Sequence, residues 1–473
     1  MSFWYQNGVC SNNRHSHRRK TTRTHQGTGA FLILCTVGAV VRAQDVAPPG
    51  FIARFDVTQR LEYSDNPDLE ADGESDFFGR TVLGFGLESI TSVDRIALNL
   101  STDIEEGRDN QSSFDLTNST VGLNYDRNTR NALLGLNASY RESDTNNSAL
   151  DADFDQDGNI INQDSGTRQS YNFGLEGAIG REAPIGASFN WRYSELTFSG
   201  TNDPDLTDQS TNEVSGQIDF RIDRRITANL TASYRDFDAQ GDGVNRETIG
   251  FGAGVVLEVT PILTADLSLS YDSIERSGNE VGTDEGVSVG FGLTRALPNG
   301  SVGLNFASDV SSNDDGRRSF LNVSRNLELP RGALSVTLGV TGADVVGTDP
   351  LVDIEYRHEL PTAVLSFGLA QSVNTDSNND EDINTSLRAS YDQRINSISS
   401  FGLSVSFFNR NELQQNGSDG KRLDVNLTYR YDLTRDWGLV SGFSHSFSAE
   451  DNARDRRSNT VFVGLQRSFN WTP

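Results

Sequence analysis

Apolar and polar side chains alternate residue by residue along most of the chain from Phe51 onward. The segment 226–235, ITANLTASYR, places its apolar residues on one face and its Thr, Asn, Ser and Arg residues on the other. Successive strand residues point to opposite faces, whereas a helix repeats about every 3.6 residues, so this period of two predicts strands. The same pattern recurs in 383–394 and 422–433. The chain is therefore predicted to be all-β.

The connections between these segments fall into two kinds that alternate along the chain. Short ones carry turn residues, as at 298–300 and 330–332, whereas long ones are acidic and rich in Gly and Asn, as at 64–76 and 374–382. A transmembrane barrel closes tight hairpins on the periplasmic side and carries longer loops outside, whereas a soluble sandwich has no reason to sort its loops. We therefore predict a transmembrane antiparallel up-and-down β-barrel with its apolar face toward lipid.

The number of alternating segments predicts the size of this barrel. About 22 segments, within a range of about 18 to 22, lie between Phe51 and Trp471, and each has roughly ten or more residues. That length is enough for a tilted strand to cross the hydrocarbon layer. We expect one barrel domain over residues 44–473.

The first 43 residues resemble a secretory signal peptide. A basic region is followed by the apolar run 30–41 and by a Val-Arg-Ala end, which predicts cleavage after Ala43. Without the six basic residues of 1–43, the mature chain carries 34 basic and 66 acidic residues, a net charge of −32, so nucleic acid is not an expected partner. Cys10 and Cys35 leave with this segment, which excludes disulfides, thiol catalysis and thiolate metal sites in the mature chain.

Aromatic residues precede the long connections on the apolar face, where a membrane-interface belt would hold them. They are Tyr63, Tyr140, Trp191, Tyr193, Tyr234, Tyr271 and Phe407. The last segment puts Val461, Phe469 and Trp471 on one face, but it also carries Arg467 there and runs on to Pro473. With this pattern the chain resembles the porin-like outer-membrane barrels of Gram-negative bacteria. The resemblance implies outer-membrane lipid, lipopolysaccharide and the barrel assembly machinery as partners.

Charged residues on the polar face are candidates for the wall of an interior. They are Asp353, Glu355, Arg357, Arg388, Asp392, Asp424 and Arg430. Two interpretations stay open, because such residues either set the selectivity of a water-filled passage or pair across strands and stabilise the wall.

The longest connection, residues 143–167, contains the acidic stretch DADFDQDGNIINQDSG at 151–166. It resembles an EF-hand loop, with Asp153, Asp155, Asp157, the Asn159 carbonyl and Asp164 as possible Ca²⁺ ligands, but the flanking strand periodicity excludes a helix-opening sensor. By the resemblance to porins, whose third long loop narrows the lumen, Asp151, Asp153, Asp155 and Asp157 are alternatively expected to line a cation-favouring constriction. A merely solvated loop is the third interpretation.

Catalysis is not expected, because the histidines of the mature chain, His358 and His445, lie on the lipid-facing parity without a recognisable Ser or Asp signature. No cofactor is expected apart from possible Ca²⁺.

The leading prediction is an outer-membrane porin-like channel for passive diffusion of small hydrophilic solutes, leaning toward cations and possible as a homo-oligomer. A TonB-dependent receptor is ranked lower, because strands begin within about ten residues of the cleavage site and leave no room for a plug. The alternatives are a conduit for exopolysaccharide export and a structural or adhesive surface barrel.

Overall fold

The computed structural model describes residues 50–107, 114–145, 166–201, 206–241, 243–278, 281–310, 316–343, 347–375, 381–412, 419–451 and 453–472. These residues form 22 strands and contain no helix long and apolar enough to cross a membrane. The strands are β1 (Gly50–Ser64), β2 (Asp76–Ile90), β3 (Asp94–Glu106), β4 (Phe114–Asn128), β5 (Ala132–Asp144), β6 (Thr167–Ile179), β7 (Ile185–Ser199), β8 (Gln209–Arg221), β9 (Ile226–Ala239), β10 (Val244–Thr260), β11 (Leu263–Gly278), β12 (Gly282–Leu297), β13 (Gly300–Val310), β14 (Arg317–Leu329), β15 (Gly332–Ala343), β16 (Gly347–Glu359), β17 (Ala363–Thr375), β18 (Glu381–Arg394), β19 (Ser399–Glu412), β20 (Gly420–Asp432), β21 (Trp437–Glu450) and β22 (Arg456–Trp471).

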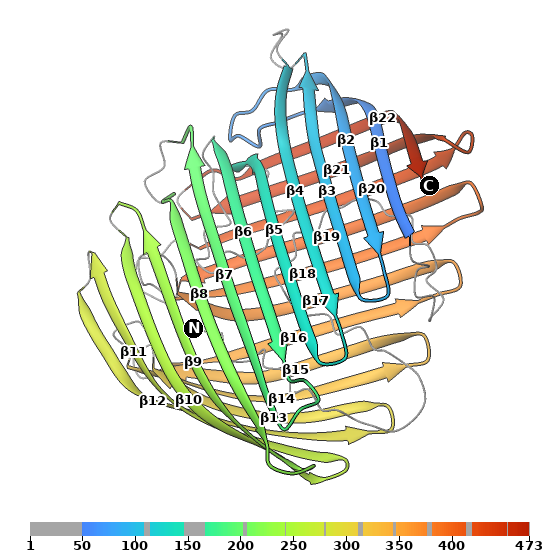
Figure 1. The fold of residues 1–473 in the computed structure, drawn as a ribbon. Helices are drawn as coiled ribbons and strands as arrows, with labels where there is room; N and C mark the ends of the chain where they lie inside the picture. The colour runs from blue at the N-terminus through green and yellow to red at the C-terminus, as the bar shows by residue number, and fades with distance from the viewer. Residues whose placement is uncertain are drawn as a thin grey trace.

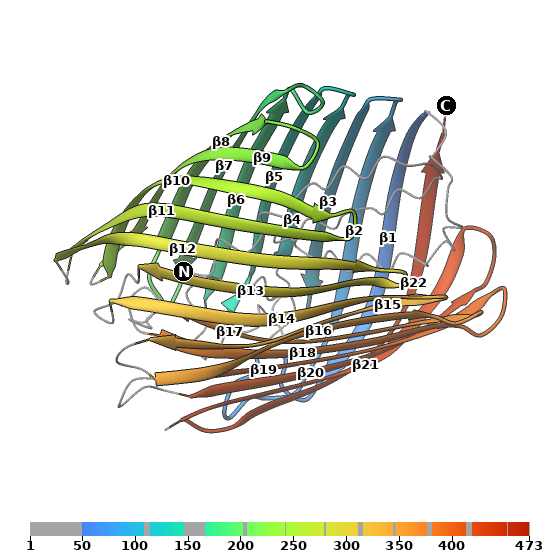
Figure 2. The ribbon, with the colours of Figure 1, turned by 90° about the horizontal axis from the view of Figure 1, so that it is seen from below.

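Each strand pairs antiparallel with the next one along the chain, and the sheet closes on itself. β22 pairs with β1 from Ala53↔Trp471 to Ser64↔Thr460, so no edge strand remains in the 22-stranded sheet. Figure 1 shows β1 to β9 forming the front wall, with β16 to β22 passing behind them, and Figure 2 shows the same closure from below. The predicted fold and strand number are confirmed.

The register shows which face of the sheet points outward. Leu267, Phe291, Phe306 and Leu321 are Cα partners across β11 to β14 and form one lateral row. All four side chains are exposed although they are large and apolar. In a transmembrane barrel, a continuous row of large, exposed apolar side chains lies on the exterior and faces lipid. The structure is therefore a transmembrane antiparallel β-barrel, as predicted.

Aromatic side chains gather on the exterior near one end of the barrel. Tyr140 Oη donates to Glu142 Oε2 over 2.8 Å, and Tyr271 Oη donates to Glu285 Oε2 over 2.6 Å. This end carries the connections after β1, β3, β5 and the other odd-numbered strands, and we call it the loop side. A ring with a hydrogen-bonded polar tip suits the boundary between lipid and water.

The opposite end, which we call the turn side, carries short connections such as 298–299 between β12 and β13. The predicted strict alternation of short and long connections is wrong in part, because the loop-side connections 240–243, 279–281 and 344–346 are also short. Two of them join hairpins that include β10 and β11, which have 17 and 16 residues.

Arg467, the charged exception in the last apolar row, is accommodated by neighbouring rings. Its guanidinium carbon lies 5.0 Å from the centre of the Trp437 ring and 4.5 Å from that of Phe469. Cation–π contacts of this length stabilise a charge that faces the membrane boundary.

Candidate functional site

The side chains that face the interior of the barrel are mostly polar. They are more deeply buried at the loop side than at the turn side. Charged and amide side chains line the loop-side part of the interior, and we call this set the collar. The collar consists of Glu62, Arg80, Asp103, Glu105, Arg246, Asp272, Arg276, Arg318, Asp382, Asn384, Arg410, Arg422 and Asp424, nearly all of them buried.

β18 shows the change of burial along a single strand. Asp382 and Asn384, near the loop-side end, are 1% and 2% exposed, whereas Arg388 and Asp392, further toward the turn side, are exposed. All four side chains share one parity and therefore one face of the sheet. The interior thus offers a solvated wall at the turn side and a desolvated, charged wall at the loop side.

Arg80 is the centre of the collar on β1 to β3. Its Nη2 lies 2.7 Å from Glu105 Oε1, its Nη1 lies 3.3 Å from Asp103 Oδ2, and its Nε lies 3.4 Å from Glu62 Oε2. Arg60 Nε approaches Glu62 Oε1 at 3.3 Å. A β-bulge between Ser101 and Asp103 interrupts the register of β3 and β4 just where Asp103 enters this cluster.

A second buried ion pair lies on β20, on the other side of the β1–β22 closure from Arg80, and a serine of β21 contacts it. Arg422 Nε lies 3.0 Å from Asp424 Oδ2, and Ser446 Oγ donates to Asp424 Oδ1 over 2.7 Å. Both charged side chains are almost inaccessible to solvent. Because their donors and acceptors are occupied, the pair is held rigidly in the wall.

Asn384 is a buried amide of the collar that is unsatisfied within the described residues. Neither its Oδ1 nor its Nδ2 has a hydrogen-bond partner among the described residues, although the side chain is buried. Its Cα partner on β19 is Arg410, so the amide lies beside a guanidinium. A buried amide without hydrogen-bond partners destabilises the folded state by about 1–3 kcal/mol, and a bound polar ligand that supplies the hydrogen bonds would recover this free energy.

Further arginines complete the collar on β10 to β14. Arg276 Nη2 pairs with Asp284 Oδ2 at 3.0 Å, Arg318 Nη1 donates to Thr341 Oγ1 over 3.1 Å, and Arg246 stacks over the Phe237 ring at 4.3 Å. The collar therefore presents guanidinium donors around the interior, which suit carboxylate, phosphate and other oxygen-rich anions.

The predicted wall residues all have the interior parity, but they fall into two groups. Asp353, Glu355, Arg357, Arg388, Asp392 and Arg430 lie away from the loop-side rim, whereas Asp424 belongs to the collar. Their role in selectivity stays a prediction. The other collar residues were not predicted, although the sequence contains one signal for them: charged residues of interior parity recur within about five positions of the loop-side strand ends.

The acidic loop lies outside the described residues. This applies to Asp151, Asp153, Asp155, Asp157, Asn159 and Asp164, and to the signal peptide 1–43. The described part of the chain contains no group of three or more His, Cys, Asp or Glu residues that could hold a metal ion. Calcium binding and the constriction therefore stay predictions.

The two histidines occupy exterior positions. His445 Nδ1 lies 2.8 Å from Asn459 Oδ1, and His358 stacks on Tyr356 with the ring centres 6.0 Å apart. Their strand register pairs them with exterior residues such as Val425 and Leu365.

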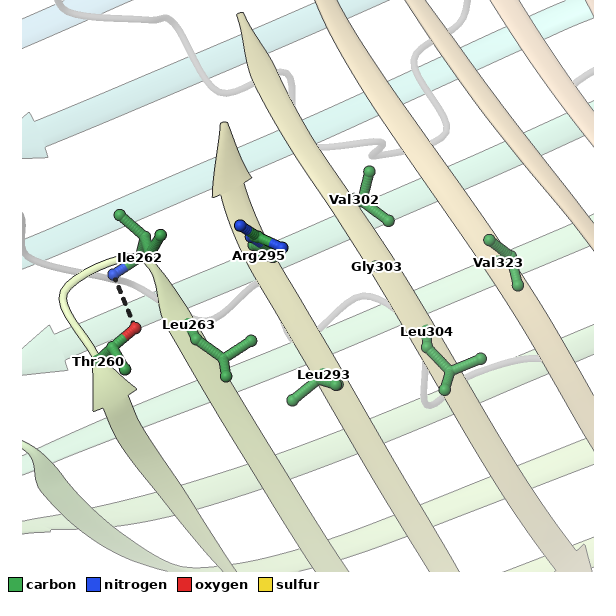
Figure 3. Close-up of a pocket in the computed structure, with 9 residues that line it drawn as sticks. All are labelled: Thr260, Ile262, Leu263, Leu293, Arg295, Val302, Gly303, Leu304 and Val323. Carbon is green, nitrogen blue, oxygen red and sulfur yellow. Dashed lines mark hydrogen bonds between the residues drawn. The ribbon is translucent and has the colours of Figure 1, made fainter. Parts of the chain in front are cut away.

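A separate groove lies on the exterior near the turn side of β10 to β14. Its volume is about 540 Å³, and it is lined by Thr260, Ile262, Leu263, Leu293, Arg295, Val302, Gly303, Leu304 and Val323. Figure 3 shows Arg295 between Ile262 and Val302, with leucines grouped beyond it. Arg295 is the charged member of this set.

Comparison with known proteins identifies the fold. No family model matches the chain, and no curated protein matches it. Among solved structures, it is similar to the FrpB iron transporter from Neisseria meningitidis, with a TM-score of 0.56 at 8% identity, covering 89% of this chain and 82% of that one. It is also similar to the ferric enterobactin receptor PfeA from Pseudomonas aeruginosa, with a TM-score of 0.51 at 10% identity, covering 90% and 82%.

These findings correct the predicted function. The barrels that this chain resembles are a receptor and an iron transporter, so the prediction of a porin-like channel for passive diffusion is wrong. The collar gives a physical reason, because buried and paired charges line the interior where a passive channel needs a solvated wall. The same comparison does not support the exopolysaccharide conduit or the adhesive barrel.

Proposed function

We propose that this protein is a ligand-specific uptake receptor of the outer membrane, and that its collar binds a small polar ligand. The observation that carries the proposal is Asn384, a buried interior amide without a hydrogen-bond partner in the part of the chain that the structure describes, paired across the strands with Arg410 in a desolvated wall. When a buried polar group lacks a hydrogen-bond partner, a ligand that supplies this partner binds with a gain in free energy.

The chemistry of the collar supports an oxygen-rich anionic ligand. Guanidinium groups from β2, β10, β11, β14, β19 and β20 belong to it, and the carboxylates between them keep the arginines oriented. The similar barrels include a ferric enterobactin receptor and an iron transporter, which makes iron chelates the first ligands to test. Transport is proposed in preference to catalysis, since both histidines have exterior positions.

The test compares ferric enterobactin binding to the wild-type barrel and to Asn384→Leu. Loss of the amide removes ligand hydrogen bonds worth about 1–3 kcal/mol, so we expect binding at least about fivefold weaker by fluorescence titration. The unliganded variant is expected to be as stable as the wild type or more stable, because an unsatisfied buried amide has been removed.

Asn426→Leu is the matched control, because Asn426 is also an interior amide but is only half-buried and lies further from the loop-side rim. We expect it to bind the chelate like the wild type. Equal binding by Asn384→Leu and the wild type would contradict the proposed site. A steady ohmic conductance of the wild-type barrel in planar bilayers would contradict the proposed receptor.

A further inference from the structure

The exterior groove borders a lateral row of four side chains, two of which are arginines. Leu263, Arg295, Val302 and Arg325 are successive Cα partners across β11 to β14 and point outward. The next row toward the middle of the barrel is Ala265, Leu293, Leu304 and Val323, and the row beyond it is Leu267, Phe291, Phe306 and Leu321. Two guanidinium groups therefore lie at the turn-side end of two rows that consist entirely of apolar side chains.

Neither guanidinium is neutralised by a carboxylate among the described residues. Arg325 Nη1 donates to the Ser301 and Asn326 carbonyls over 3.0 and 2.6 Å, and its Nη2 donates to Asn299 Oδ1 over 2.7 Å. Arg295 is exposed, and its guanidinium makes no ion pair or hydrogen bond within the described part of the chain. Arginine at the edge of the hydrocarbon layer is stabilised when an anion meets it there.

The spacing of the two arginines suits one anionic group. They are on β12 and β14, two strands apart, so their backbones are about 10 Å apart. Only Val302 lies between them in this row, and the Arg295 side chain is long enough to lean toward an anionic group above it, which the positive charge of Arg325 also attracts. The volume of about 540 Å³ lies within the range of about 300–1,000 Å³ for small-molecule sites.

We propose that this groove binds one glycerophospholipid of the membrane leaflet at the turn side, with its phosphate at Arg295 and Arg325 and an acyl chain along Leu293, Leu304 and Val323. Charge complementarity selects this occupant, because Arg295 is the charged residue of a mostly apolar lining and Arg325 follows it in the same row, outside the lining itself. Basic pockets at the membrane boundary bind anionic lipid head groups in the same way.

The experiment measures binding of dioleoylphosphatidylglycerol to the detergent-purified, delipidated barrel by native mass spectrometry. Arg295→Gln is expected to bind the lipid about fivefold more weakly, the effect of about 1 kcal/mol per arginine near a lipid surface. Val323→Trp keeps the exterior apolar but fills the groove, so we expect this variant to lose the bound lipid. Retention of the folded barrel by each variant is checked by heat-dependent migration in electrophoresis.

Arg467→Gln is the matched control, because Arg467 is another exterior arginine at the turn side but lies over aromatic rings on β21 and β22. Its lipid binding is expected to equal that of the wild type. The proposal fails if Arg295→Gln binds like the wild type or if Arg467→Gln weakens binding equally. It also fails if inorganic phosphate displaces the lipid at equal concentration, since the site would then recognise phosphate without the acyl chain.

Discussion

Replacing Arg80 with methionine is expected to lower the free energy of unfolding by about 3–5 kcal/mol, the usual cost of removing one partner from a buried ion pair. Glu62 and Glu105 are 6% and 4% exposed at their side chains, so neither is well placed to recover hydration when the guanidinium is gone. Asp103, at 3.3 Å, loses its partner as well. Methionine retains most of the apolar length of arginine, so the loss reports on charge more than on packing.

The measurement is guanidinium-induced unfolding of the barrel in lipid vesicles, followed by tryptophan fluorescence. Arg95→Met is the matched control on the same two strands, because Arg95 pairs with Glu88 at 2.8 Å with both side chains partly exposed. An exposed pair is worth about 0–1 kcal/mol, so this variant should unfold close to the wild type. Equal midpoints for Arg80→Met and Arg95→Met would show that the collar is solvated in the membrane.

Most of the fold can be predicted from local sequence patterns. The segment 422–433 alternates so regularly that its period of two alone predicts Asp424 and Arg430 on the interior face, and β20 has that register. The turn residues at 298–299 and 330–331 mark hairpin ends correctly. Such features depend on neighbours within one hairpin, where a period of two and turn chemistry act directly.

The collar depends on distant residues, which a single sequence does not reveal. Ser64 and Ser458 are 394 positions apart, yet their hydroxyls are 3.2 Å apart across the closure of the barrel. Asn384 and Arg410 become neighbours only through the β18–β19 register. Alternation predicts that each residue faces inward, but it does not predict how deeply each is buried.

The error about function has the same origin. A water-filled passage and a desolvated binding wall both require polar residues at alternate positions, so the pattern around Arg388 and Asp392 fits either. The difference lies in burial along a strand, from Asp382 and Asn384 at the loop side to those exposed residues further along. Exclusion of solvent from one end of the interior depends on the whole folded barrel, so the alternation within one strand does not predict it.

Replacing Leu269 with arginine is expected to destabilise the barrel by about 2–4 kcal/mol, because Leu269 lies on the exterior near the middle of β11 and the charge would enter the hydrocarbon layer. Its partners on both sides, Ala253 and Val289, are also apolar, so the new guanidinium finds no hydrogen-bond acceptor.

Ser268→Arg provides the opposite expectation from the next residue along the strand. Ser268 faces the interior between Gly254 and Gly290, which leave room for a long side chain, and the change should stay within about 0.5 kcal/mol. Both variants are measured by the same vesicle unfolding titration. Because a shift of one residue exchanges the two faces of a strand, a larger loss for Ser268→Arg than for Leu269→Arg would reverse the inside and outside of the barrel. The collar and the lipid groove would then both lie on the wrong side of the wall.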